Sequence, residues 1–183
     1  MTNKLRIIGG VWRSRQIAFD DAPGLRPTPD RVRETLFNWL QADVVNSCCL
    51  DLFAGSGALG FEAASRGAKR VVQVESNIGV CRNLRENVVK LAASQVTVVA
   101  MAVERFLLES DERFDLVFLD PPFAQNLAIP ACRQLEEGGR LSAHAKIYVE
   151  TERGSDLSDM PPDWRLLKDK VAGDVRFSLF QRQ

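Results

Sequence analysis

The chain contains the run Leu50-Asp51-Leu52-Phe53-Ala54-Gly55-Ser56-Gly57-Ala58-Leu59-Gly60. An apolar strand pattern leads into a Gly-x-Gly turn, and the pattern then predicts a helix. Glycine has no side chain, so the backbone at such a turn can approach a bound cofactor closely. Glu75 ends the next apolar run, where an acid can accept hydrogen bonds from both hydroxyls of an adenosine ribose. We therefore predict a nucleoside-containing cofactor at this turn.

From residue 48 onward, short apolar runs alternate with longer amphipathic ones, which is the pattern of a parallel sheet covered by helices. The predicted parallel strands are Cys49 to Phe53, Arg70 to Glu75, Gln95 to Ala100, Phe114 to Asp120 and Lys146 to Glu150. The predicted helices between them are Ala58 to Arg66, Asn77 to Ala93, Val103 to Glu109 and Leu127 to Glu137. Trp164 to Val171 and Val175 to Gln181 predict an antiparallel hairpin at one edge. The fold class is therefore predicted to be α/β.

The amino-terminal part has a different pattern. Leu5 to Phe19 contains two strand-like runs around Gly9-Gly10, a proline-rich link follows from Pro23 to Pro29, and a helix is expected to begin near Asp30. A length of 183 residues fits one domain with a short appendage. We predict an appendage at residues 1–29 and a Rossmann-like domain at residues 30–183.

The charges are balanced overall but unevenly distributed. The chain has 24 basic and 24 acidic side chains, yet residues 1–40 hold seven basic and four acidic ones. No apolar run is long enough to span a bilayer, and the first residues lack the apolar stretch of a secretory signal. The four cysteines form no C-x-x-C pair, and the single histidine, His144, has no acidic or cysteine cluster around it. We expect a cytoplasmic protein with a basic cap, no membrane partner and no metal.

Charge distinguishes between possible cofactors. Asp51 lies just before the glycine turn, and Asp120 ends a later strand. Carboxylates at this edge would repel the pyrophosphate of a dinucleotide, but they would attract the sulfonium and ammonium groups of S-adenosylmethionine. No G-K-[ST] follows the glycines, which argues against a phosphate-binding loop. We predict S-adenosylmethionine as cofactor and S-adenosylhomocysteine as product, while a capping role for Asp51 stays open.

The tetrapeptide Asp120-Pro121-Pro122-Phe123 follows a predicted strand and forms the candidate catalytic site. Two prolines fix an extended, stiff segment at the carboxyl edge of the sheet, where α/β folds bind ligands. The Asp120 carboxylate and the Pro121 carbonyl can accept hydrogen bonds from the amino group of a base, which draws its lone pair toward a methyl donor. Phe123 offers a stacking face for a base turned out of its helix. A structural proline loop with a capping aspartate is the alternative.

These motifs resemble a known family. Asp51 to Gly60 with Glu75, and Asp120 to Phe123, resemble the two halves of class I S-adenosylmethionine-dependent methyltransferases that act on exocyclic amines. The strings Arg6-Ile7-Ile8-Gly9-Gly10-x-x-Arg13-x-Arg15 and Arg26-Pro27-Thr28-x-Asp30-Arg31-x-Arg33-Glu34 resemble the RsmD-type bacterial enzymes, which make 2-methylguanosine in 16S ribosomal RNA. The resemblance spans nearly the whole chain.

The resemblance implies a seven-stranded, mostly parallel sheet with an antiparallel carboxyl-terminal hairpin, plus a small amino-terminal β-hairpin that helps to hold RNA. It implies a monomer that methylates the N2 amine of a guanine in 16S ribosomal RNA or in the assembling small subunit. The implied cofactor residues are Asp51, Phe53, Ala54, Gly55, Ser56, Gly57, Glu75, Ser76, Ala102 and Val103, the last two through their backbone. The implied RNA-binding residues are Arg6, Arg13, Arg15, Arg26, Thr28, Arg31 and Arg33; a solvated charged face is the alternative for these arginines.

Two other functions remain open at this point. DNA adenine-N6 methyltransferases also use an Asp-Pro-Pro-aromatic loop, but this chain has no separate domain for reading duplex sequence. A non-catalytic module that binds the cofactor or RNA would have the same glycine turn without the reaction. Both readings depend on what the Asp-Pro-Pro-Phe segment does.

Overall fold

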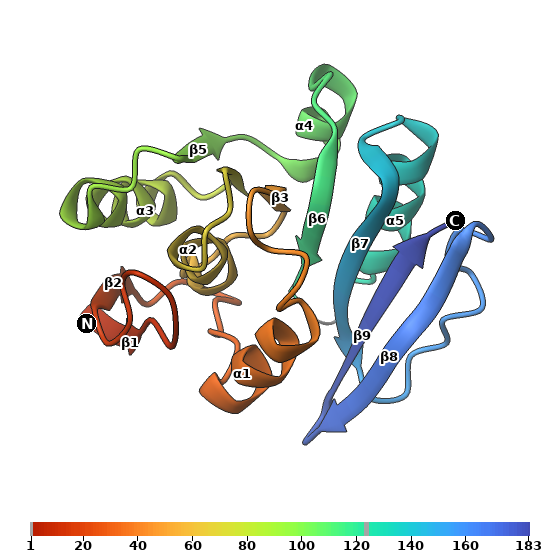
Figure 1. The fold of residues 1–183 in the computed structure, drawn as a ribbon, viewed down its shortest axis with the longest axis horizontal. Coiled ribbons are helices and arrows are strands. Elements are labelled where there is room, and N and C mark those ends of the chain that lie inside the picture. Colours follow the sequence, from red (N-terminus) through yellow and green to blue (C-terminus); the bar gives the residue numbers. More distant parts are fainter. Residues whose placement is uncertain (1, 123–124) are drawn as a thin grey trace.

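In the computed structural model, which describes residues 2–122 and 125–183, a seven-stranded sheet runs through the molecule (Figure 1). Its order is β5-β4-β3-β6-β7-β9-β8. The strands are β3 (Cys48–Asp51), β4 (Arg70–Glu75), β5 (Val96–Ala100), β6 (Phe114–Leu119), β7 (Leu141–Glu152), β8 (Trp164–Ala172) and β9 (Val175–Arg182). The first five strands in this order are parallel, and β9 lies antiparallel between β7 and β8. The predicted α/β fold with an antiparallel carboxyl-terminal hairpin is confirmed.

Helices cover both faces of the sheet. Residues of α1 (Asp30–Trp39), α2 (Ala58–Ser65) and α3 (Ile78–Leu91) share one apolar cluster, and residues of α4 (Val103–Glu109) and α5 (Ala128–Glu137) share the other. Successive strand residues point to opposite faces, so each strand contributes to both clusters. This two-sided burial explains why the central strands are continuously apolar in sequence.

The prediction of β7 is wrong at its amino end, because the strand begins at Leu141 rather than Lys146. Ser142, Ala143 and His144 interrupt the apolar pattern, and His144 has a positive φ of 61°. The pairing of β6 with β7 shifts register in the same region. Where a strand bends away from its neighbour, apolar residues do not alternate regularly along it. The sequence pattern therefore did not indicate a strand before Lys146.

The amino-terminal residues form the expected β-hairpin of β1 (Thr2–Arg6) and β2 (Gln16–Asp20). It packs beside α2 and α3 at one end of the molecule (Figure 1). The Asn87 side chain of α3 donates to the Ala18 carbonyl at 2.7 Å and accepts from the Ala18 amide at 3.0 Å. Lys90 donates to the Gln16 carbonyl at 2.8 Å. The hairpin is therefore fixed to the α/β domain through the outer surface of α3.

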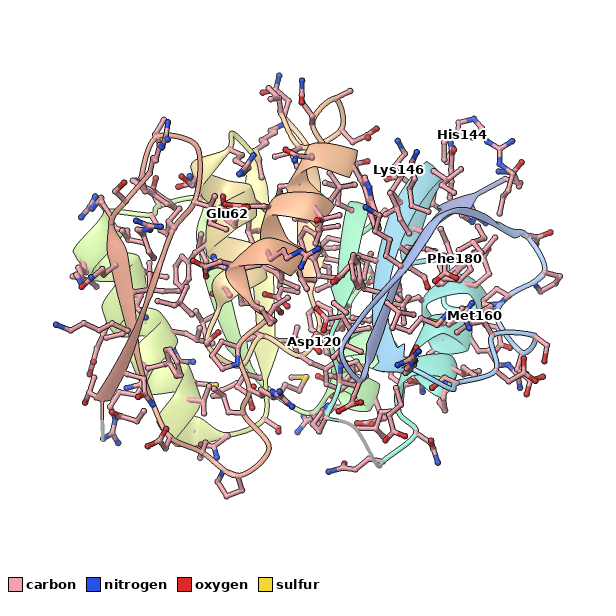
Figure 2. All side chains as sticks on the ribbon, turned by 90° about the horizontal axis from the view of Figure 1, so that it is seen from below. Glu62, Asp120, His144, Lys146, Met160 and Phe180 are labelled. Carbon is pink, nitrogen blue, oxygen red and sulfur yellow. The ribbon has the colours of Figure 1, made fainter. Side chains whose placement is uncertain are left out.

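A buried carboxylate holds the connection between the two hairpin strands. Glu62 of α2 accepts hydrogen bonds from the backbone amides of Ile8 and Gly9, both at 2.8 Å, and from Arg66 at 2.7 Å. The Arg33 guanidinium of α1 lies 3.5 Å from it, and neither side chain is exposed. Figure 2 shows Glu62 between the hairpin and α1.

Among the described residues, no helix has the length and apolar character needed to cross a membrane.

Candidate active site

Four acidic residues mark the carboxyl edge of the sheet. Asp51, Glu75 and Asp120 close or follow β3, β4 and β6, and Glu150 lies near the end of β7. These strands are parallel neighbours, so their carboxyl ends meet at one edge. Figure 2 shows Asp120 far from His144, which lies at the amino end of β7. The structure therefore gathers acids of distant sequence position at the edge where ligands bind in such folds.

The two glycines of the turn have different roles. At Gly55, where φ is 51°, an added Cβ would meet nothing closer than Leu25 and the Phe53 carbonyl, both at 3.8 Å. At Gly57, where φ is 79°, an added Cβ would lie 2.6 Å from the Leu84 side chain. An added Cβ at Gly55 would therefore make only ordinary van der Waals contacts, although the positive φ favours glycine there, whereas the core beneath the turn requires glycine at position 57.

The Glu75 carboxylate lies beside the glycine turn. One oxygen accepts from the Gly55 amide at 3.1 Å and the other from the Asn77 amide at 2.8 Å. The side chain is half-buried, and the Met101 amide donates to its backbone carbonyl at 2.9 Å. The end of β4 and the turn after β5 are thus side by side. The chain brings together the acid, the glycine turn and the predicted backbone contact at Ala102.

The other predicted cofactor residues differ in exposure. Ser76 and Ala102 are exposed, and Phe53 is half-buried. Ala54, Ser56 and Val103 are buried, and Val103 belongs to the core beneath α4. Ser76, Ala102 and the backbone of the turn are therefore the predicted positions that a ligand can reach in this structure.

Asp51 is buried, with 1% of its surface exposed, and accepts a hydrogen bond from the Gly60 amide at 3.0 Å. Its side chain is thus a cap for the turn between β3 and α2, which was the alternative left open. Burial, together with the nearby charges of Asp120 and Glu75, raises the pKa of Asp51 to about 7. Negative charge at this edge is therefore in excess, and a bound cation would relieve it.

The candidate catalytic segment begins beside the proline-rich link. Asp120 is half-buried and accepts a hydrogen bond from the Thr28 hydroxyl at 3.1 Å. Burial raises the pKa of its carboxyl to about 6. Pro121 is buried and Pro122 half-buried, while the predicted stacking residue Phe123 lies outside the described residues. The link therefore fixes the orientation of the acid that starts this segment.

The sequence prediction missed Glu150 and Tyr148. Glu150 is 3% exposed, accepts a hydrogen bond from the Tyr148 hydroxyl at 2.8 Å and lies beside Asp120, because the preceding residues Leu119 and Val149 are paired. The signal was present, because the predicted strand Lys146 to Glu150 ends in an acid. That acid can be assigned to the site only when the strand order is known, because the order puts β7 next to β6.

Comparison with known proteins identifies the family. The family described as "Conserved hypothetical protein 95" matches residues 5–181. "Ribosomal RNA small subunit methyltransferase D" of Escherichia coli strain K12 is 45% identical over 182 residues, covering 100% of this chain and 92% of the relative. Its namesake from Haemophilus influenzae is 46% identical, covering 97% and 94%. This chain belongs to the RsmD-type family. The solved structure named "Putative methyltransferase yhhF" from Escherichia coli has a TM-score of 0.89 at 44% identity, covering 99% of each chain.

Within this RsmD-type chain, the predicted RNA-binding residues fall into two groups. Arg6, Arg13, Arg15, Arg26 and Arg31 are exposed. The prediction needs correction at the two others, Arg33 and Thr28, which are buried. Arg33 also contacts Asp30 and Glu62, so its charge is neutralised inside the protein. Neither side chain can reach a phosphate in this conformation.

The structure adds basic residues that the sequence analysis did not select. Arg82 and Arg85 lie on the exposed side of α3, next to Lys90, around a shallow hollow of about 500 Å³. This surface continues into the hairpin, because Arg15 donates to the Lys90 carbonyl at 2.6 Å. The polar face of a helix does not indicate which element lies beside it, so these residues could not be assigned to the hairpin surface from their positions along the chain.

Proposed function

We propose that this chain uses S-adenosylmethionine to methylate the exocyclic N2 amine of a guanine in 16S ribosomal RNA. Asp120 carries the proposal, because it starts an Asp-Pro-Pro segment at the edge of the sheet that also holds the glycine turn. The names of the relatives support ribosomal RNA of the small subunit as the substrate. The guanine N2 position follows from the sequence resemblance.

The residues at the edge fit this cofactor. Glu75 would accept hydrogen bonds from the ribose hydroxyls, and the glycine backbone at position 55 would let the methionine part approach closely. The charges of Asp120 and Glu75, which add to burial in raising the pKa of Asp51, would favour a sulfonium. When bound, S-adenosylmethionine supplies a methyl group attached to positively charged sulfur. No metal ion is needed for this transfer.

The catalytic segment would act on the amine. The Asp120 carboxylate and the Pro121 carbonyl accept hydrogen bonds from the two amine hydrogens, which orients the nitrogen and increases the electron density of its lone pair. The nitrogen gains a bond to the methyl carbon, the electron pair of the broken carbon–sulfur bond stays on sulfur, and the nitrogen releases one proton. Asp120 lies where its ionised carboxylate accepts that proton, which then passes to water.

Substrate binding would use the basic surface. Exposed arginines of the hairpin and link, with Arg82 and Arg85 of α3, would contact phosphates and position the RNA. The chain would act in the cytoplasm as a monomer, on naked 16S ribosomal RNA or on the assembling small subunit. The first 29 residues would serve as the RNA-binding appendage.

The test of this function is methyl transfer from tritiated S-adenosylmethionine to small ribosomal subunits, or their RNA, from cells that lack the protein. Mass spectrometry of the nucleosides should show N2-methylguanosine. Incorporation into plasmid DNA as N6-methyladenine, with none into ribosomal RNA, would contradict the proposal. Cofactor binding without transfer to either would favour a non-catalytic module.

Removing the ribose acceptor should weaken cofactor binding. We expect Glu75→Ala to reduce the affinity for S-adenosylmethionine by on the order of tenfold to a hundredfold, because hydrogen bonds to a charged group are lost. Isothermal titration calorimetry measures the effect. Glu109→Ala is the matched control, since that exposed glutamate of α4 pairs only with Arg105 on its own helix. Equal affinity of the Glu75→Ala and Glu109→Ala proteins would refute this role.

Removing exposed arginines should weaken RNA binding in a salt-dependent manner. For the double variant Arg13→Ala, Arg26→Ala we expect the slope of log affinity against log salt to fall by about 2, since each phosphate contact contributes about one counterion. Filter binding to 16S ribosomal RNA at several salt concentrations measures this slope. Arg165→Ala, on the exposed surface of β8, is the control. An unchanged slope in the double variant would mean that these arginines form a solvated face.

A further inference from the structure

Glu150, which is buried, and Asp120, which is half-buried, form a pair of acids at the proposed reaction centre. The register of β6 and β7 pairs Leu119 with Val149, so the next residue of each strand brings these two carboxyls together. The charge of Asp120 acts on Glu150 and raises its pKa. In the described part of the chain, neither carboxylate has an ion pair with a lysine or arginine. The negative charge of the pair is therefore not compensated by protein cations.

Two carboxyls can hydrogen-bond directly only if one of them carries a proton. Burial and the charge of Asp120 raise the pKa of Glu150 to about 8, whereas burial raises that of Asp120 to about 6. Because both shifts are upward, we expect the pair to retain one proton near neutral pH, and the charge of Asp120 favours its placement on Glu150. The two apparent values belong to the pair as a unit.

The neighbouring hydroxyls fix how this proton is oriented. The Tyr148 hydroxyl donates to Oε1 of Glu150 at 2.8 Å, and the Thr28 hydroxyl donates to Oδ2 of Asp120 at 3.1 Å. Asp51 of β3 is the other acid that faces Asp120, and Glu152 and Asp156 line a pocket with Glu150 beyond β7. The hydroxyl donors favour the ionised carboxylates, but burial and the charge of Asp120 are the larger effects on Glu150 and favour its protonated form.

We propose that Glu150 is a positioning residue, a neutral acid that donates its proton in a hydrogen bond to Asp120 and aims the remaining carboxylate oxygen at the exocyclic amine. This inference rests on the proposed function. Glu150 would not touch the substrate amine itself. By holding the proton, it limits the two acids to one negative charge and prevents them from repelling each other.

The proposal sets a working pH range. Below about pH 6 Asp120 becomes protonated and loses its acceptor, and above about pH 8 Glu150 ionises and pushes Asp120 away. We therefore expect a bell-shaped dependence of kcat on pH. In Glu150→Gln the amide still donates to Asp120 but cannot ionise, so the decline above pH 8 should disappear.

The experiment compares wild type, Glu150→Gln, Glu150→Ala and the control Glu137→Gln, an exposed glutamate of α5. Values of kcat and of KM for S-adenosylmethionine are measured from below pH 6 to above pH 8. We expect Glu150→Ala to lower kcat by on the order of tenfold to a hundredfold, with KM little changed, and Glu150→Gln to stay within about threefold of wild type near neutral pH. Wild-type kcat in Glu150→Ala, or a persistent alkaline decline in Glu150→Gln, would overturn the proposal.

Thermal unfolding provides a readout that does not need activity. The pKa of Glu150 is raised from 4.5 to about 8 in the folded protein, so its contribution to stability is present at low pH and is lost as the pH rises through that range. The Tm of wild type should therefore fall more steeply toward pH 8 than that of Glu150→Gln. Parallel curves would refute the shared proton. If wild type transfers no methyl group to RNA, the proposed function fails while this comparison still stands.

Discussion

Asp120→Ala should abolish methyl transfer while cofactor binding persists. The variant removes the charged acceptor that orients the amine and takes its proton, and we expect kcat to fall on the order of a thousandfold, as for other groups that stabilise developing charge. It also removes one of the acids that raise the pKa of Asp51. The Asp51 carboxylate should therefore be ionised more readily and still accept the hydrogen bond from the Gly60 amide, so the glycine turn should stay intact. Single-turnover transfer of tritiated methyl groups measures the rate, and calorimetry measures the affinity for S-adenosylmethionine.

Two further variants make this result interpretable. Asp120→Asn keeps a hydrogen-bond acceptor without the charge, so its rate should lie between those of wild type and Asp120→Ala. Asp163→Asn changes an exposed aspartate in the loop before β8 and should behave as wild type. A rate for Asp120→Ala within about tenfold of wild type would be too high for the role proposed here and would support a purely structural segment.

The central elements could be predicted because burial leaves sharp boundaries in the sequence. Strand β4 and helix α4 have the predicted bounds, Arg70–Glu75 and Val103–Glu109. Each apolar run there is flanked directly by polar residues or by a turn. The start of β7 was missed because the strand bends at the edge of the core. Three residues there lack apolar alternation, and the pairing with β6 shifts register in the same region.

The sequence predicted which residues of the site lie at strand ends, but not which of their side chains contact each other. Glu75 and Asp120 follow apolar runs, so their position at the carboxyl edge is implied by a parallel sheet. Glu150 also ends such a run, but its contact with Asp120 depends on β6 and β7 being neighbours, which no single strand reveals. The same holds for Thr28, whose hydrogen bond to Asp120 spans 92 residues.

The spacing of apolar residues in α1 tests the prediction that Arg33 binds RNA. Leu36, Phe37 and Leu40 follow it at three, four and seven residues and are all buried, so position 33 belongs to the apolar face of α1. An arginine at such a position must have an internal partner. One partner, Asp30, lies three residues earlier on the same helix, whereas the buried partner, Glu62, lies on α2 and could not be identified from the sequence of α1.

The same buried pair leads to the largest expected effect on stability. Glu62→Ala removes the buried partner of the Arg33 charge, leaves it the exposed Asp30, and removes the acceptor of the Ile8 and Gly9 amides. Breaking a buried ion pair by removing one partner costs about 3–5 kcal/mol, and we expect the free energy of unfolding to fall by that amount. Chemical denaturation followed by circular dichroism measures the loss.

A local readout separates this effect from general destabilisation. Because both amides of the hairpin connection depend on Glu62, their hydrogen exchange should accelerate more than that of the amides of β6 in the centre of the sheet. Glu34→Ala, an exposed glutamate on α1, should change stability by no more than about 0.5 kcal/mol. If Glu62→Ala were as stable as Glu34→Ala, the buried carboxylate would not be what fixes the hairpin to the domain. A loss of RNA affinity that accompanies the faster exchange would link the ordering of the hairpin to substrate binding, since its arginines keep their charge in this variant.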